Sequence, residues 1–177
     1  MKTISISTFS IFLISAAFTS SFASEKMRSH GAHVHGEAKL ALAFENPNLG
    51  EGDLDVPAEA IIGFEHAAKT PAQKKQEADG LALLRKTISQ FWAIPPAIGC
   101  EIFDVKAERE PGDGKHSDIE ASFKIKCEQP IFGIKAKTQI FKTFPKIKKL
   151  TVSLVLPKSA SEQKLSPEKT ELEFSGK

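Results

Sequence analysis

Three histidines lie within six residues of one another, at positions 30, 33 and 35. His33 and His35 are two residues apart, and side chains at this spacing in a β-strand point to the same face of the sheet. Two imidazoles on one face can bind the same metal ion, and imidazole nitrogen suits zinc, copper and nickel better than calcium or magnesium. The segment therefore predicts a metal site with His33 and His35 at its centre and His30 as a third ligand.

Further ligands are needed because a tetrahedral zinc site takes three or four of them. Glu65 and His66 form one candidate pair, since they end an apolar run and would be held rigidly. His116 and Asp118 form a second pair, since they alternate onto the polar face of a predicted strand. The alternatives stay open: His66 can be a packed or capping histidine, and residues 116 and 118 can belong to a solvated strand face.

No motif of an established catalytic chemistry occurs in the sequence. It lacks a glycine-rich phosphate loop, a GxSxG elbow and an HExxH motif, and no spacing singles out a nucleophile. We therefore expect that the protein is not an enzyme. Methionine occurs only at Met1 and Met27, which disfavours a copper(I) carrier because that ion prefers soft sulfur ligands. Imidazole ligands alone do not choose among zinc, copper and nickel, so all three ions fit these residues.

The first 23 residues have the pattern of a cleavable signal peptide. Lys2 supplies a positive start, residues 11–18 are mainly apolar, and Ser21-Phe22-Ala23 places small residues before a cleavage point. The apolar run is shorter than the roughly 20 residues of a membrane-spanning helix. We expect cleavage after Ala23 and a periplasmic location. Residues 24–177 are expected to form a single soluble zinc-binding domain that does not span the membrane.

Charge and cysteine content narrow the partners and the compartment. The formal net charge of +2 does not suggest a nucleic-acid partner. Cys100 and Cys127 have no neighbouring CxxC partner, and in an oxidising compartment such a pair favours a disulfide over a thiolate metal ligand or a redox pair. The two cysteines lie symmetrically about Asp113 and Gly114, so a hairpin would bring them opposite each other.

The hydrophobic pattern predicts an α+β fold, with a mainly antiparallel β-sheet, one main α-helix packed on it and a single disulfide. Thr70, Pro71 and Gln73 give the start of that helix a capping box, and Pro95-Pro96 ends it. Strands are expected over residues 33–45, 53–56, 98–107, 116–127, 135–144, 147–156 and 170–174. The polar segment 158–167 is expected to be a linker.

Over nearly all of its expected mature length, the chain resembles the zinc-regulated periplasmic ZrgA family. The resemblance is carried by His30-Gly31-Ala32-His33-Val34-His35-Gly36-Glu37-Ala38-Lys39-Leu40, by Gly63-Phe64-Glu65-His66, by the Cys100 strand, by His116-Ser117-Asp118-Ile119 leading into Phe123 and Cys127, and by the region from Phe141 to Phe144-Pro145. It implies a periplasmic zinc-binding protein that assists zinc uptake together with a zinc import transporter. The positions it implies for the site are His30, His33, His35, Glu65, His66 and His116.

One departure from the family pattern limits the expected capacity for zinc. Relatives often carry a long loop rich in His, Asp and Glu before the position of His116, whereas residues 108–115 contain no histidine. One ordered site, or one or two weaker sites, is therefore expected rather than a high-capacity zinc store. The alternative from another class is a metal-free envelope protein that binds a partner through sheet edges and the basic strands between Lys135 and Lys149.

Overall fold

The computed structural model describes residues 34–110, 112 and 116–175, which share one hydrophobic core. The predicted signal peptide, His30 and His33 lie outside these residues. No helix in the described ranges is long and apolar enough to cross a membrane.

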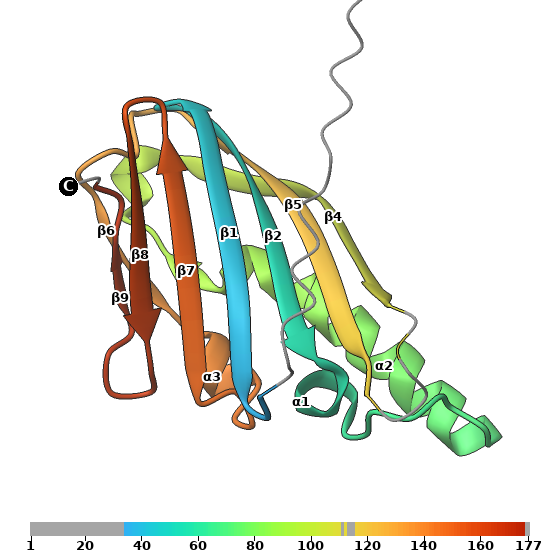
Figure 1. Cartoon of the computed structure of the whole chain (residues 1–177). Coiled ribbons are helices and arrows are strands. Elements are labelled where there is room, and N and C mark those ends of the chain that lie inside the picture. The colour runs from blue at the N-terminus through green and yellow to red at the C-terminus, as the bar shows by residue number, and fades with distance from the viewer. Residues whose placement is uncertain (1–33, 111, 113–115, 176–177) are drawn as a thin grey trace, which may run out of the picture. The chain divides into compact units, whose positions relative to one another are not determined.

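In the described part of the chain, six strands form the larger sheet, in the order β4-β5-β2-β1-β7-β8, and three form a smaller sheet, in the order β3-β6-β9 (Figure 1). The larger sheet consists of β1 (Glu37–Asn46), β2 (Leu49–Pro57), β4 (Cys100–Arg109), β5 (Asp118–Cys127), β7 (Lys149–Leu156) and β8 (Ser159–Leu165). The smaller sheet consists of β3 (Trp92–Ala93), β6 (Lys135–Thr138) and β9 (Glu171–Glu173). The helices are α1 (Ala58–Ile62), α2 (Pro71–Thr87) and α3 (Ile140–Thr143).

The predicted α+β fold with one main helix and a mainly antiparallel sheet is confirmed, although one strand pair of the larger sheet is parallel and makes that sheet mixed. Strands β1 and β7 pair in parallel along the centre of the sheet, from Glu37 opposite Lys149 to Ala43 opposite Val155. A parallel neighbour requires a long connection that returns the chain to the end where it started. Here that connection runs through β2 to α3, and the local alternation of residues does not encode it.

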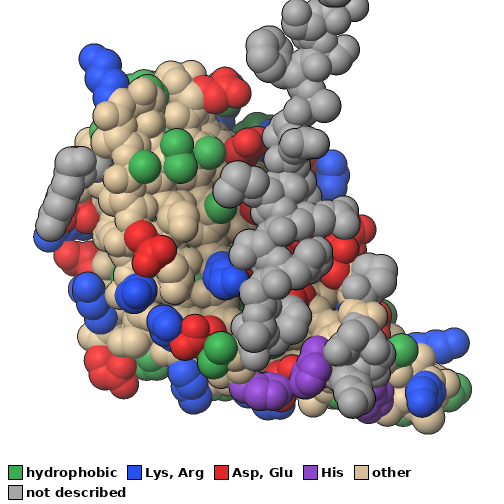
Figure 2. All heavy atoms as spheres, in the orientation of Figure 1, with side chains coloured by type: hydrophobic (Ala, Val, Ile, Leu, Met, Phe, Trp, Pro, Cys, Tyr) green, Lys and Arg blue, Asp and Glu red, His purple; other side chains and the backbone are tan. Residues whose placement is uncertain are grey.

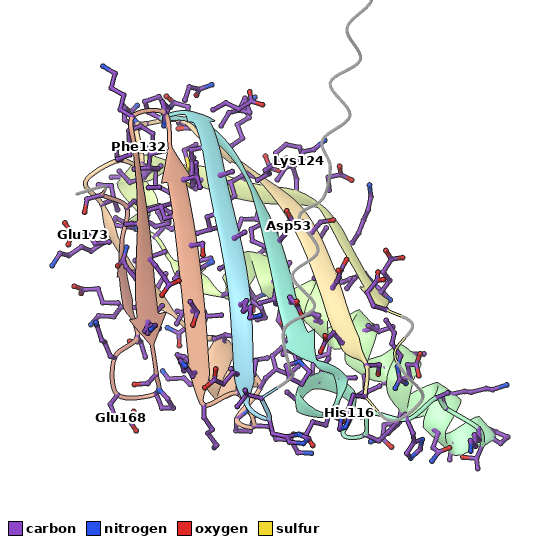
Figure 3. All side chains as sticks on the ribbon, in the orientation of Figure 1. Asp53, His116, Lys124, Phe132, Glu168 and Glu173 are labelled. Atoms are coloured by element: carbon purple, nitrogen blue, oxygen red, sulfur yellow. A yellow bond between two sulfur atoms is a disulfide. The ribbon has the colours of Figure 1, made fainter. Side chains whose placement is uncertain are left out.

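The central strands bury one face and leave the other open. Leu40, Leu42 and Phe44 of β1 are buried, as are Ile119 and Phe123 of β5, which confirms the predicted alternation. On the open face, Asp53 and Lys124 project away from the core (Figure 3).

The capping box of α2 is confirmed. The Thr70 hydroxyl accepts from the backbone N–H of Gln73 at 3.2 Å, and the Gln73 side chain accepts from the Thr70 N–H at 3.1 Å. Gly80 lies inside this helix because α1 passes close by: a Cβ there would lie 2.7 Å from Cγ2 of Ile62. The glycine therefore permits the close approach of α1 and α2, next to the connection that carries Glu65.

Several element predictions are wrong. The main helix does not run to Pro95-Pro96, because α2 ends at Thr87 and β3 lies between them. Residues 135–144 are not one strand, because β6 ends at Thr138, whose hydroxyl accepts from the N–H of Ile140 at the start of α3. The segment 158–167 is not a linker but contains the edge strand β8. Its polar sequence reflects exposure, since Leu165 is the only buried residue within this strand.

The predicted disulfide is present, and it lies at the opposite end of β5 from His116. Cys100 and Cys127 are direct cross-strand partners of β4 and β5. The two cysteines are 27 residues apart in the sequence, so the bond stabilises the fold mainly by restricting the unfolded chain.

Replacing both cysteines, C100A/C127A, should lower the free energy of unfolding by about 3 kcal/mol through the greater freedom of the unfolded chain. Urea unfolding of oxidised wild type, reduced wild type and the double variant measures this difference. Reduced wild type serves as the control, because it loses the cross-link without changing any side-chain volume. Equal unfolding midpoints for all three samples would contradict the expectation.

Candidate metal centre

Three segments that are distant in sequence meet at one end of the strands of the larger sheet. His35 lies in the turn just before β1, Glu65 lies in the connection between α1 and α2, and His116 lies just before β5. Strand β2 lies between β5 and β1 and runs antiparallel to both. The starts of β1 and β5 and the end of β2 therefore lie side by side at this end of the sheet. Histidine side chains gather there in Figure 2, and Figure 3 shows His116 beside the helical end of the sheet.

The side chains of His35, Glu65 and His116 form the candidate metal centre. One ligand atom from each lies within 4.8 Å of the others. Nδ1 of His35 is 3.3 Å from Oε1 of Glu65, while Nδ1 of His116 is in direct contact with Oε2 of the same carboxylate. The centroids of the two imidazole rings are 6.1 Å apart. The Glu65 carboxylate therefore lies between the two histidines and contacts both.

The three side chains differ in how firmly their surroundings hold them. The Glu65 side chain is 11% exposed, whereas those of His35 and His116 are 63% and 45% exposed. The Glu65 carbonyl oxygen accepts from the buried hydroxyl of Ser117 at 2.7 Å. The carboxylate is thus the fixed part of the group, while the histidines remain accessible to an ion from solvent.

Glu59 also contacts the candidate metal centre, and the sequence analysis did not identify it. Its carboxylate in α1 accepts a hydrogen bond from Nδ1 of His35 at 2.8 Å. An isolated glutamate in a five-residue helix carries no sequence signal that identifies it, because its partner is far away in the chain. The contact orients the imidazole, as carboxylates beside metal-binding histidines commonly do.

His35 is placed differently from the sequence prediction. Strand β1 begins at Glu37, and Gly36 adopts φ 76° in the preceding turn. The carbonyl of Gly36 accepts from the N–H groups of Lys148 and Lys149 at 2.7 and 3.1 Å. The alternation of β1 therefore does not extend back to His35, and the expectation that His35 lies on a strand face is wrong. His33, its predicted partner, lies outside the described residues.

Two other predicted ligands, His66 and Asp118, are not members of the described group. The ring of His66 stacks on Phe64, with centroids 5.1 Å apart, and its Nδ1 is 3.0 Å from the carbonyl of Ala67. The His66 side chain is exposed, and its described contacts are with Phe64 and Ala67. Asp118 begins β5 opposite Pro57 and, within the described ranges, is not a member of the three-residue group.

A shallow hollow of about 360 Å³ adjoins the candidate metal centre. It is lined by His35, Gly36, Glu59, Pro145, Lys146 and Lys148. The site therefore lies on an accessible surface, and an ion can reach the exposed imidazoles without opening the core.

Two imidazoles and one carboxylate are a donor set that suits zinc. Such a set leaves a fourth tetrahedral position for water or for another ligand, with Zn–N and Zn–O distances of about 2.0–2.2 Å. The ligand atoms of the group are already close enough that rotations of the exposed histidines would bring them to one ion. The two carboxylates, Glu65 and Glu59, would supply the negative charge that offsets part of the charge of the ion.

The pKa of His35 should lie above its usual value of 6.5. The hydrogen bond to Glu59 and the charge of that carboxylate raise it, and the charge of Glu65 raises it further. NMR titration of the metal-free protein should show this, and E59Q should move the pKa back down. E101Q, on the exposed surface of β4, is the matched control and should leave it unchanged. A His35 pKa at or below 6.5 in wild type would contradict the described contacts.

Comparison with known protein families identifies one family that the chain matches. The family model described as ZrgA family zinc uptake protein matches residues 32–174, which is most of the 177-residue chain. The matched range includes His35, Glu65 and His116. No curated protein matches the chain.

Proposed function

The chain belongs to the ZrgA family of zinc uptake proteins, and from this premise we propose that it captures zinc in the periplasm through His35, Glu65 and His116. The observation that carries the proposal is the convergence of these three side chains from three separate segments. The family assignment supports a role in zinc uptake, and the donor chemistry fits zinc as the cargo.

Each residue has a distinct part in the proposed binding. Glu65 provides a fixed carboxylate, and His116 and His35 provide imidazoles from opposite sides of it. Glu59 orients the ring of His35 through its contact with Nδ1. Because imidazole binds zinc only when neutral, protons compete with the ion, and affinity falls as the pH drops through the raised pKa of His35.

The exposure of the two histidines supports capture and transfer rather than permanent storage. Structural zinc sites are usually closed by four protein ligands, whereas a site with an open position can exchange its ligands. We propose that the bound ion passes to a component of a zinc import transporter, which supplies ligands at the open position. In this role the protein acts by binding and not by catalysis.

Zinc titration of the metal-free protein by calorimetry should show a saturable site of micromolar or tighter affinity. E65Q and H116A should each weaken the affinity by at least about tenfold, since even changes outside the ligand shell commonly cost 10–100-fold. H66A is the matched control: it removes a histidine next to Glu65 whose ring stacks on Phe64, and it should leave the affinity unchanged.

Flat heats for wild type, together with no retained zinc in elemental analysis, would contradict the proposal. That result would favour the metal-free partner-binding alternative. Equal losses in H66A and H116A would instead show that the ligands have been assigned wrongly.

Processing of the leader is tested on protein expressed at full length in a Gram-negative host. Protein recovered from the periplasmic fraction should begin at Ser24, because the small residues Ser21 and Ala23 precede the cleavage point. Intact-mass measurement and N-terminal sequencing give the answer. Protein found only in the cytoplasm with Met1 retained would contradict the periplasmic part of the proposal.

A further inference from the structure

One guanidinium group bonds to both ligand-bearing segments of the candidate metal centre. Arg109 ends β4, and its side chain is only 12% exposed. Its Nη2 donates to the carbonyl of Glu65 and, at 2.8 Å, to the carbonyl of His66. Its Nε donates to the hydroxyl of Ser117 at 2.9 Å. Ser117 directly follows His116, so Arg109 joins the backbone at Glu65 to the residue beside the second ligand.

The charge of Arg109 is compensated within the same group of contacts. Its Nη1 donates to the Glu77 carboxylate of α2 at 2.8 Å. Its guanidinium carbon lies 5.6 Å from the centre of the Phe64 ring, within the range of a cation–π contact. A mostly buried arginine is tolerated when paired in this way. The contact with Glu77 uses Nη1, so Nη2 and Nε remain free to bond to the two segments that carry Glu65 and His116.

The backbone and the side chain of Arg109 bond to different parts of the fold. Arg109 pairs with Ile119 in the β4–β5 ladder through its backbone, which any side chain would preserve. Within the described residues, the carbonyl of Glu65 accepts from Arg109 and Ser117, and the carbonyl of His66 accepts from Arg109. The side chain of Arg109 therefore fixes the Glu65 segment rather than the sheet.

We propose that Arg109 is a positioning residue for the metal centre, which sets the separation of Glu65 and His116 through its bonds to both segments. The proposal rests on the zinc-binding function proposed above. A guanidinium is planar and presents its donors in a fixed fork, so it holds several acceptors at a defined spacing. Lysine has a single flexible ammonium group and reproduces this only in part.

The test compares R109Q, R109K and R85A in the full chain. Arg85 is the matched control because its Nη1 donates to the Ala107 carbonyl at 2.7 Å, which joins α2 to β4 without contact to Glu65 or Ser117. Hydrogen–deuterium exchange of the metal-free proteins reports on residues 63–69. Zinc affinity and the visible absorption spectrum of the cobalt(II)-substituted proteins report on the site itself.

R109Q should speed exchange in residues 63–69, lower zinc affinity by about 10–100-fold and change the cobalt spectrum, as loss of supporting contacts commonly does. R109K should lie between R109Q and wild type, and R85A should match wild type in all three measurements. If R109Q does not fold by circular dichroism, S117A carries the test, because it removes the hydroxyl that bonds to both Arg109 and Glu65.

Two results would overturn the inference while leaving the proposed function intact. One is wild-type zinc affinity in R109Q, whether or not exchange in residues 63–69 changes. The other is a loss of affinity in R85A equal to that in R109Q, which would indicate general destabilisation. Absence of zinc binding by wild type would instead reject the proposed function, and the assigned role of Arg109 with it.

Discussion

The fixed position of the Glu65 carboxylate is the constraint on which the candidate metal centre depends. Its backbone carbonyl accepts hydrogen bonds from Ser117 and Arg109, and its side chain is 11% exposed. The histidines on either side are much more exposed and contact the two oxygens of this one carboxylate. A fixed acidic group between two accessible imidazoles would give the proposed zinc ion a defined place to bind and the imidazoles freedom to close on it.

Strand order explains why the three ligands meet. Because β2 runs antiparallel to both of its neighbours, the residues before β1, after β2 and before β5 lie at the same end of the sheet. Gly80 permits α2 to approach α1 there, and Glu77 of the same helix pairs with Arg109. The disulfide closes the opposite end of β4 and β5. The stabilising cross-link and the proposed binding site are thus at different ends of the same strands.

Local signals in the sequence predicted the elements that depend on local chemistry. Thr70 and Gln73 identified the start of α2, and alternation identified the buried faces of β1 and β5. The parallel pairing of β1 with β7 was not predictable in this way, because it depends on where a long connection returns. Strand β8 was missed because an exposed edge strand is polar on both faces.

The site was predicted in part for the same reason. His35, Glu65 and His116 were named from residue type and spacing, but His66 was named with them although its ring packs on Phe64. Glu59 and Arg109 were missed, since a charged residue that bonds across the fold resembles any other surface charge in sequence. The contact of Arg109 with the carbonyl of Glu65 spans 44 positions of the chain, and no local pattern encodes it.

Anomalous X-ray diffraction from crystals of the zinc-bound protein, collected above and below the zinc absorption edge, tests the proposed zinc site at His35, Glu65 and His116. We expect one strong anomalous peak within about 2.0–2.2 Å of nitrogen atoms of His35 and His116 and of a carboxylate oxygen of Glu65. A zinc peak at bonding distance from other side chains, with this group of three left unbound, would contradict it.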